Sequence, residues 1–409
     1  VLRRKAMQGV DVRVMYDDFG CITRLPMRYC KKLREMGIQA HVFNPFIPVL
    51  SGRLNNRDHR KLMIIDGKVG FTGGVNLADE YINEIERFGH WKDCGILVRG
   101  EAVWAMVMMF LSIWDYVAGL EEDVAAFRPD YPEAPAGEGY LQPFADSPLD
   151  HEDVGATIFQ SLIQSASSRV WIMTPYLILD DKMTTALCVA AKTGVDVRII
   201  TPGIPDKWYV HAVTRANYEE LTRAGVRIFE YTPGFIHSKV YLADTKQAVV
   251  GTVNLDFRSL YLHFEDAVYL YDTTVNAQVQ ADFEETFPQC REITAEQCRH
   301  THLTQRVLRA LLRLYIAGNA PAAVSLAVKQ LHRVFPPACL GNAQEADALP
   351  AVAVFLLFLD HLQNVHPLGA CFGAEAQTQR AELPIRPPQG DHIHRPQQLF
   401  HGTFLLAFV

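Results

Sequence analysis

One stretch of the sequence occurs twice with the same polar residues at the same spacing. "HRKLMIIDGKVGFTGGVN" begins at His59, and "HSKVYLADTKQAVVGTVN" begins at His237, 178 residues later. An internal duplication of chemically demanding residues predicts two related structural units rather than a chance match. The aligned pairs are His59 and His237, Lys61 and Lys239, Asp66 and Asp244, Gly73 and Gly251, and Asn76 and Asn254.

A second, apolar repeat lies upstream of each motif. "GVDVRVMYDD" begins at Gly9 and "GVDVRIITPG" begins at Gly194. Each is a β-branched run of strand type that follows a helix-like stretch ending at glycine. The chain is therefore predicted to hold two α/β halves, each contributing one His-Lys pair.

The first motif predicts a strand with a polar face. His59 and Lys61 are two residues apart, so in an extended strand both side chains project from the same face. Taken alone, the motif is equally compatible with a half-exposed strand, because Asp66-Gly67 is a favoured hairpin turn and Gly73-Gly74 a further turn. The duplication is what favours a chemical role.

The two halves differ at their beginnings. Before its "GVDVR", the second half has an expected strand at 169–174 and an expected helix at 182–192, whereas the first half has only "VLRRKAMQ". Because alternating strands and helices build sheets whose halves should match, we expect one strand and most of a helix to be missing from the amino end. On this interpretation the chain is a fragment.

The predicted organisation has four parts. The first half covers 1–120, an acidic Pro/Gly-rich linker covers 121–150, the second half covers 151–290, and a tail covers 291–409. Further helices are expected at 26–36 and 101–117. The expected strands are 11–17, 39–44, 59–66, 69–72 and 94–98 in the first half, and 169–174, 196–201, 226–231, 237–243, 248–252 and 266–271 in the second.

The composition changes after about Cys290. Eight of the fifteen histidines lie between His300 and His401, and Lys329 is the only lysine there. Helices are expected at 305–317 and 322–334. The histidine cluster could bind metal, but a biased, irregular tail is the preferred interpretation and no function is assigned to it.

Charge and cysteines limit the classes of function. The formal net charge is −7 and the pI near 6.1, so the chain lacks the basic balance typical of nucleic-acid binders. Eight scattered cysteines without a C-x-x-C pair predict reduced thiols rather than zinc ligands or disulfides. No run is apolar for long enough to span a membrane; "VWAMVMMFLSIWDYVAG" at 103–119 is interpreted as a core helix, with membrane contact as the alternative.

Two imidazoles and two ammonium groups in one pocket suit a phosphodiester substrate. Lys61 and Lys239 would neutralise the non-bridging oxygens. One histidine would attack phosphorus, while the other would protonate the departing alkoxide and later accept a proton from the incoming hydroxyl. The residues leave open which histidine has which role, and the fixed cations make a metal or other cofactor unnecessary.

Other polar residues of the motifs are expected to support this chemistry. Asn76 and Asn254 would add neutral hydrogen-bond donors where charge builds up. Asp66 and Asp244 would orient the lysine or histidine, although hairpin chemistry also explains Asp66. Glu265 and Asp93 could fix the imidazole tautomer; a surface role is the alternative for both.

At this point the residues resemble a known family. Two H-x-K-x-x-x-x-D motifs, each followed by G-[GT]-x-N, look like the phospholipase D superfamily, and longer segments resemble bacterial cardiolipin synthases over about 1–271. These segments include "FNPFIPVLSGRLNNRDHRK", "GFTGGVNLADEYINEIERFGHWKD" and "EYTPGFIHSKVYLADTKQAVVGTVNLDFRSLYLHFE". The resemblance implies two similar α/β/α sandwich halves with mixed sheets packed about a pseudo-twofold axis. The chain departs from this pattern at its amino end, where membrane helices and an opening strand are expected, and in its long irregular helical tail.

The resemblance also implies an activity. A phosphatidyl group would pass from one phosphatidylglycerol to another with release of glycerol, with His59 as nucleophile and His237 as acid and base. Gly74, Thr252 and Glu265 join the asparagines as expected substrate-binding residues. The implied partners are phosphatidylglycerol and the surface of a bacterial cell membrane, with the catalytic halves facing the cytoplasm, and no nucleic acid. A phospholipase D-type hydrolase and an inactive lipid-binding fragment remain alternatives.

Overall fold

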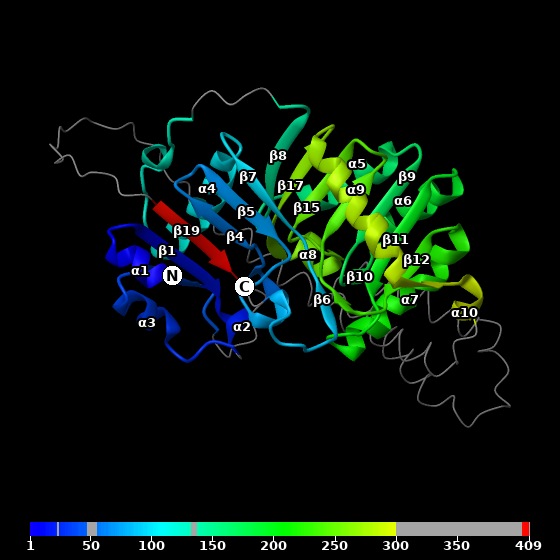
Figure 1. The fold of residues 1–409 in the computed structure, drawn as a ribbon, viewed down its shortest axis with the longest axis horizontal. Helices are drawn as coiled ribbons and strands as arrows, with labels where there is room; N and C mark the ends of the chain where they lie inside the picture. Colours follow the sequence, from blue (N-terminus) through cyan, green and yellow to red (C-terminus); the bar gives the residue numbers. More distant parts are fainter. Residues whose placement is uncertain (23, 47–54, 132–136, 300–402, 409) are drawn as a thin grey trace, which may run out of the picture. The chain divides into compact units, whose positions relative to one another are not determined.

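The computed structural model describes residues 1–22, 24–46, 55–131, 137–299 and 403–408, the last stretch by its backbone alone (Figure 1). The helices predicted at 305–317 and 322–334 lie outside the described residues. Within them, two α/β halves each carry a mixed sheet, which confirms the predicted fold class.

The sheet of the first half has the strand order β2-β1-β19-β4-β5-β7. β19 runs parallel to β1 and antiparallel to β4, so the final segment of the chain lies in the middle of a sheet built from the opening segments (Figure 1). The strands are β1 (Asp11–Asp17), β2 (Gln39–Phe43), β4 (Leu62–Ile65), β5 (Val69–Gly73), β7 (Gly95–Arg99) and β19 (Thr403–Phe408).

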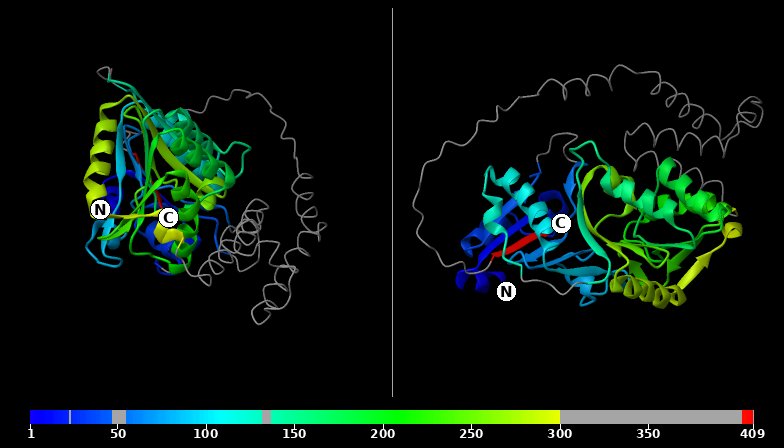
Figure 2. Two further views of the ribbon diagram at one scale, coloured as in Figure 1. Left: turned by 90° about the vertical axis from the view of Figure 1, so that its right-hand side faces the viewer. Right: turned by 90° about the horizontal axis from the view of Figure 1, so that it is seen from above.

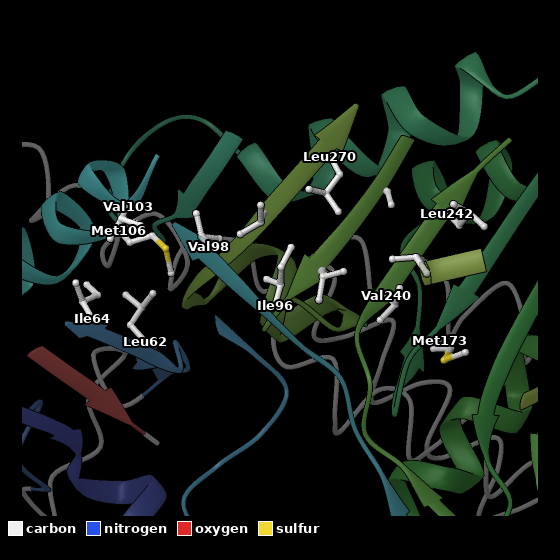
Figure 3. Packing of buried hydrophobic residues seen from close by; sticks show 14 of the residues in the cluster. Leu62, Ile64, Ile96, Val98, Val103, Met106, Met173, Val240, Leu242 and Leu270 are labelled. Atoms are coloured by element: carbon white, nitrogen blue, oxygen red, sulfur yellow. The ribbon is translucent and has the colours of Figure 1, made fainter. Parts of the chain in front are cut away.

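Helices cover both faces of this first sheet. Alternate residues of β1 point to opposite faces: Val12 and Val14 pack with Leu33, while Met15 packs with α4. Figure 3 shows Leu62 and Ile64 of β4 beside Val103 and Met106 of α4. The helices are α1 (Leu2–Met7), α2 (Asp18–Cys21), α3 (Tyr29–Glu35) and α4 (Val103–Ala118).

α4 confirms the predicted core helix. It buries a stripe at helical spacing, including Met106, Phe110 and Trp114, and ends at Gly119, whose φ of 65° suits a residue without a Cβ. Among the described residues, no helix combines the length and the apolar character needed to cross a bilayer. The cysteines that the structure describes are all free thiols, as predicted.

The second half repeats the arrangement with the order β18-β12-β11-β9-β14-β15-β17. β9 is parallel to β11 and antiparallel to β14, as β19 is to β1 and β4. The strands are β9 (Arg169–Met173), β11 (Asp196–Pro202), β12 (Arg227–Tyr231), β14 (Val240–Ala243), β15 (Gln247–Gly251), β17 (His263–Tyr271) and β18 (Cys290–Ile293).

The helices of the second half also form two layers. α5 and α6 pack through Phe159 and Leu187 on the face that carries Tyr241, while α9 packs through Phe283 on the opposite face, with Leu242 (Figure 2). The longer helices are α5 (Val154–Ser165), α6 (Asp181–Lys192), α7 (Trp208–Ala224) and α9 (Thr274–Thr286). Short helices are α8 (Phe257–Tyr261), α10 (Ala295–Arg299), η2 (Asp79–Ile82), η3 (Val124–Phe127) and η4 (Phe287–Gln289).

The predicted linker at 121–150 is partly wrong. β8 (Tyr140–Asp146) lies inside it and pairs antiparallel with β17 through seven residue pairs, from Tyr140 with Tyr271 to Asp146 with Glu265. An acidic composition rich in Pro and Gly predicts a loop. Pro143 is tolerated because, among the strands that the structure describes, β8 pairs with β17 alone, so the missing N–H faces no second strand.

Two short strand pairs join the halves. β3 (Arg57–Asp58) pairs with the start of β17, and β6 (His90–Lys92) pairs with β13 (Gly234–Ile236), both in parallel. A third pair, β10 (Leu177–Ile178) with β16 (Leu255–Asp256), lies within the second half. Because β3 and β13 immediately precede the two motif histidines, these inter-half pairs determine where the motifs lie.

Candidate active site

The motif histidines lie in breaks between strands, which corrects the continuous strands predicted at 59–66 and 237–243. The backbone N–H of His59 donates to the Phe264 carbonyl at 2.9 Å, and that of His237 donates to the Lys92 carbonyl at 2.7 Å. In each case the acceptor belongs to the other half. The chain then joins its own sheet at β4 or β14, so the strand is interrupted where the hydrogen-bonding partner changes.

Each histidine contacts a carboxylate from the other half. Nδ1 of His59 lies 2.8 Å from Oε2 of Glu265, and Nδ1 of His237 lies 2.8 Å from Oδ2 of Asp93. A carboxylate only accepts hydrogen bonds, so Nδ1 of each ring is the donor. The neutral ring therefore has its lone pair on Nε2, the tautomer that nucleophilic attack or proton acceptance needs.

Burial keeps both rings neutral. It lowers the pKa of His59 to about 3 and that of His237 to about 4, even though the facing carboxylates act in the opposite direction. Burial acts to raise the pKa of Glu265, but the adjacent His59 and His263 together outweigh it and hold that pKa below its usual range. Asp93 responds to His237 in the same way. Both carboxylates are therefore ionised partners of neutral imidazoles.

The two lysines occupy equivalent positions. Nζ of Lys61 donates to the His59 carbonyl at 2.6 Å, and Nζ of Lys239 donates to the His237 carbonyl at 2.5 Å. Burial lowers the pKa of both, that of Lys239 to about 7. The charge of Lys61 also contributes to the lowered pKa of His237 and of Lys239, so the two motifs share one electrostatic environment.

The motif asparagines are anchored by hydroxyl groups. The side-chain amide of Asn76 donates to Tyr81 Oη at 2.7 Å, and that of Asn254 donates to Ser259 Oγ at 3.0 Å. Their Oδ1 atoms are buried without a hydrogen-bond partner among the described residues. Tyr81 and Ser259 are 178 residues apart, so extending the aligned repeat by five residues would have found them.

Gly74 and Thr252 are equivalent positions that support different carboxylates. A Cβ on Gly74 would lie 1.9 Å from Oδ1 of Asp93, so this carboxylate needs glycine beside it. The hydroxyl of Thr252 instead donates to Oε2 of Glu265. Both predicted substrate-binding residues therefore lie directly against a carboxylate partner of a histidine.

The orienting role predicted for Asp244 is wrong. Its carboxylate accepts hydrogen bonds from the backbone of Ser167, Ser168 and Arg169, and these bonds hold its pKa below the usual range although burial acts to raise it. Asp244 lies in the turn after β14, with φ of 53°, and Asp66 lies in the equivalent turn after β4, with φ of 54°. Sequence spacing could not show that the turn directs Asp244 away from the lysine and towards β9.

His263 was missed by the sequence interpretation. It lies two residues before Glu265 on β17, and its ring centroid is 5.6 Å from that of His59. Period-two alternation along β17 gives the signal, because residues 263 and 265 share one face of a strand.

Comparison with known proteins shows the family of the chain. Residues 1–86 and 159–287 match the family described as cardiolipin synthase, phospholipase D-like domain. The chain belongs to this family. It is 39% identical over 319 residues to a cardiolipin synthase of Geobacillus kaustophilus, covering 77% of this chain and 62% of that protein. It is 38% identical to cardiolipin synthase 2 of Bacillus anthracis, covering 77% of this chain and 61% of that protein.

Two further matches extend the comparison. An uncharacterized protein of Streptococcus mutans is 46% identical over 314 residues, which are 77% of this chain and 68% of that protein. The crystal structure of a phosphatidylserine synthase from Haemophilus influenzae superposes with a TM-score of 0.58 at 15% identity, covering 76% of this chain and 82% of that one. The latter supports the fold alone.

Proposed function

We propose that the chain transfers a phosphatidyl group from one phosphatidylglycerol to another, forming cardiolipin and releasing glycerol. The observation that carries this proposal is the pair of buried imidazoles, each bonded through Nδ1 to a carboxylate of the other half. Membership of the cardiolipin synthase family supports the choice of substrate, and the chain spans about 62% of the length of the cardiolipin synthases that it matches.

In the first step His59 acts as the nucleophile. Its Nε2 lone pair attacks phosphorus, the bond from phosphorus to the glycerol oxygen breaks, and a phosphatidyl-histidine forms. His237 donates a proton to the departing oxygen, so glycerol leaves neutral. A bound phosphate anion stabilises the imidazolium of His237 and thereby raises its pKa from the low value that burial imposes.

In the second step His237 acts as a base. It accepts the proton of a headgroup hydroxyl on the second phosphatidylglycerol, whose oxygen attacks phosphorus while the bond to His59 breaks. Lys61 and Lys239 stabilise the negative charge on the non-bridging oxygens in both steps, and the amides of Asn76 and Asn254 add donors. Nucleophile, acid and charge stabilisation are all supplied by side chains.

The substrate implies a place of action. Phosphatidylglycerol carries two acyl chains and resides in membranes, so we propose that the protein works at the surface of a bacterial cell membrane with both halves facing the cytoplasm. The free thiols of the described cysteines fit a reducing compartment.

The test is incubation with headgroup-labelled phosphatidylglycerol in mixed micelles. We expect cardiolipin and free glycerol in a one-to-one ratio; phosphatidic acid without cardiolipin would instead make the chain a hydrolase. For variants of the motif histidines, the matched control is His151→Ala, because His151 is exposed and lies outside the site. Vesicle binding without any turnover would contradict the enzyme proposal.

A further inference from the structure

His263 and Glu265 place potential metal-ligand atoms beside His59. Potential ligand atoms of His59, His263 and Glu265 all lie within 4.8 Å of one another. Nδ1 of His263 is 3.5 Å from Oε1 of Glu265. The proposed reaction uses His59 and Glu265 but gives His263 no part, so its presence is unexplained by phosphatidyl transfer.

The same side chains have unsatisfied polar atoms. Both ring nitrogens of His263 and Oε1 of Glu265 are buried without a hydrogen-bond partner among the residues that the structure describes. Two of these atoms, Nδ1 of His263 and Oε1 of Glu265, face each other at 3.5 Å, whereas Nε2 of His263 has no hydrogen-bond partner among the described residues. Because buried polar atoms in folded proteins are nearly always paired, the cluster has unused capacity for a bound ligand.

The donor set selects the class of ligand. Two imidazoles and one carboxylate are the ligands that Zn²⁺ and similar transition-metal ions prefer, whereas Mg²⁺ and Ca²⁺ prefer oxygen alone. Asp256 lies near enough to interact electrostatically with His263 and adds negative charge, while the ammonium of Lys61 opposes a cation.

We propose that His59, His263 and Glu265 form an inhibitory binding site for Zn²⁺ or a chemically similar divalent ion. The inhibitory consequence rests on the proposed function, whereas metal binding does not. A metal ion on Nδ1 of His59 would replace the hydrogen bond to Glu265 and leave the ring proton on Nε2. Because the lone pair on Nε2 is what attacks phosphorus, the metal-bound ring could not form the phosphatidyl-histidine.

The first test measures Zn²⁺ binding without turnover, by competition with a chromophoric chelator. Other histidines also bind zinc, so the decisive quantity is the difference between the wild type and His263→Asn. We expect the variant to lose one tightly bound zinc per chain. His263→Cys, which restores a zinc ligand, should recover it, and His151→Asn should match the wild type. Equal stoichiometry and affinity in the wild type and His263→Asn would overturn the site.

The second test measures zinc inhibition of the proposed transfer. We expect His263→Asn to turn over at a rate similar to wild type without zinc and to need at least about 10-fold more zinc for half inhibition. Equal sensitivity in both proteins would overturn the inhibitory role. If the wild type shows no turnover while the binding difference persists, the proposed function fails and the metal site stands.

Discussion

The two halves build the same sheet from strands that come in a different order along the sequence. In the second half, β9 lies between β11 and β14 and comes just before them in the sequence; in the first half, the equivalent position between β1 and β4 is taken by β19, from residues 403–408. Both strands run parallel to one neighbour and antiparallel to the other. The comparison teaches that the flanking strands define this position and that it can be filled from a distant part of the chain.

The halves also differ in how they hold the carboxylates. The second half gives Glu265 to His59 and supports it with the Thr252 hydroxyl; the first half gives the shorter Asp93 to His237 and leaves space for it with Gly74. Each histidine needs a buried carboxylate that accepts a hydrogen bond from its Nδ1. The two halves use different residues at equivalent positions to support that carboxylate. Four experiments test how far the two halves are functionally equivalent.

The largest effect is expected from the histidines themselves. His59→Ala and His237→Ala should each lower turnover on the order of 10⁴- to 10⁶-fold, because each removes a group that takes part in bond making or proton transfer. The proposed asymmetry appears after a denaturing quench at alkaline pH, which preserves the bond between phosphorus and histidine nitrogen: mass spectrometry should find the phosphatidyl group on His59 and none on His237. An adduct on His237 alone would reverse the assigned roles.

Removing the carboxylate charge should rank second. Asp93→Asn and Glu265→Gln are expected to lower kcat on the order of 10²- to 10⁴-fold, because an amide can donate to Nδ1 and so favour the wrong tautomer. If the halves are equivalent, the losses will agree within about tenfold. Asp282→Asn, which alters a carboxylate bonded to Lys92 outside the motifs, is the control.

The supporting positions should give smaller effects of different kinds. Gly74→Ala would place a methyl group against Asp93, so we expect about 1–3 kcal/mol of lost stability and roughly tenfold lower activity. Thr252→Val keeps the shape but removes a hydroxyl that donates to Glu265 and accepts from the backbone N–H of Asp266, so we expect about 1–3 kcal/mol of lost stability. Gly137→Ala, where an added Cβ contacts nothing within 4 Å, is the control for chemical denaturation.

The smallest expected change is a shift in a pH profile. Burial lowers the pKa of Lys239 to about 7, so in the free enzyme its positive charge is present below that pH and is lost above it. We therefore expect kcat/KM to fall as the pH rises through about 7. Lys239→Arg should move this descending limb to higher pH, whereas Lys246→Arg, on an exposed turn, should leave it unchanged. If the descending limb of the pH profile does not move in Lys239→Arg, the group that titrates there is not Lys239.

Local patterns were sufficient for much of this fold. The β-branched runs at Gly9 and Gly194 predicted β1 and β11, and the apolar spacing after Glu101 predicted α4. Helices α5, α7 and α9 are not among the predicted elements, although α7, for example, buries Val213 and Leu221 at helical spacing and ends at Gly225, with φ of 103°. The helical spacing of apolar residues is therefore a local signal that is sufficient to predict such helices.

The remaining errors have a long-range cause. The run from His59 to Asp66 contains no Gly or Pro that would mark a break, so it could not show that the chain changes partner from β17 to its own sheet at Lys61. Asp93 and Glu265 were both recognised as possible imidazole partners. Their pairing with particular histidines depends on which residues of the other half come close, and no local spacing contains that information.

The exchange of carboxylates has a consequence for how such a catalyst is assembled. A half produced alone would hold its motif histidine without the carboxylate that accepts from Nδ1. Its own carboxylate would lack the histidine that it pairs with. The proposed transfer therefore requires both halves, and two separately made halves are expected to gain it together, at the moment they dock.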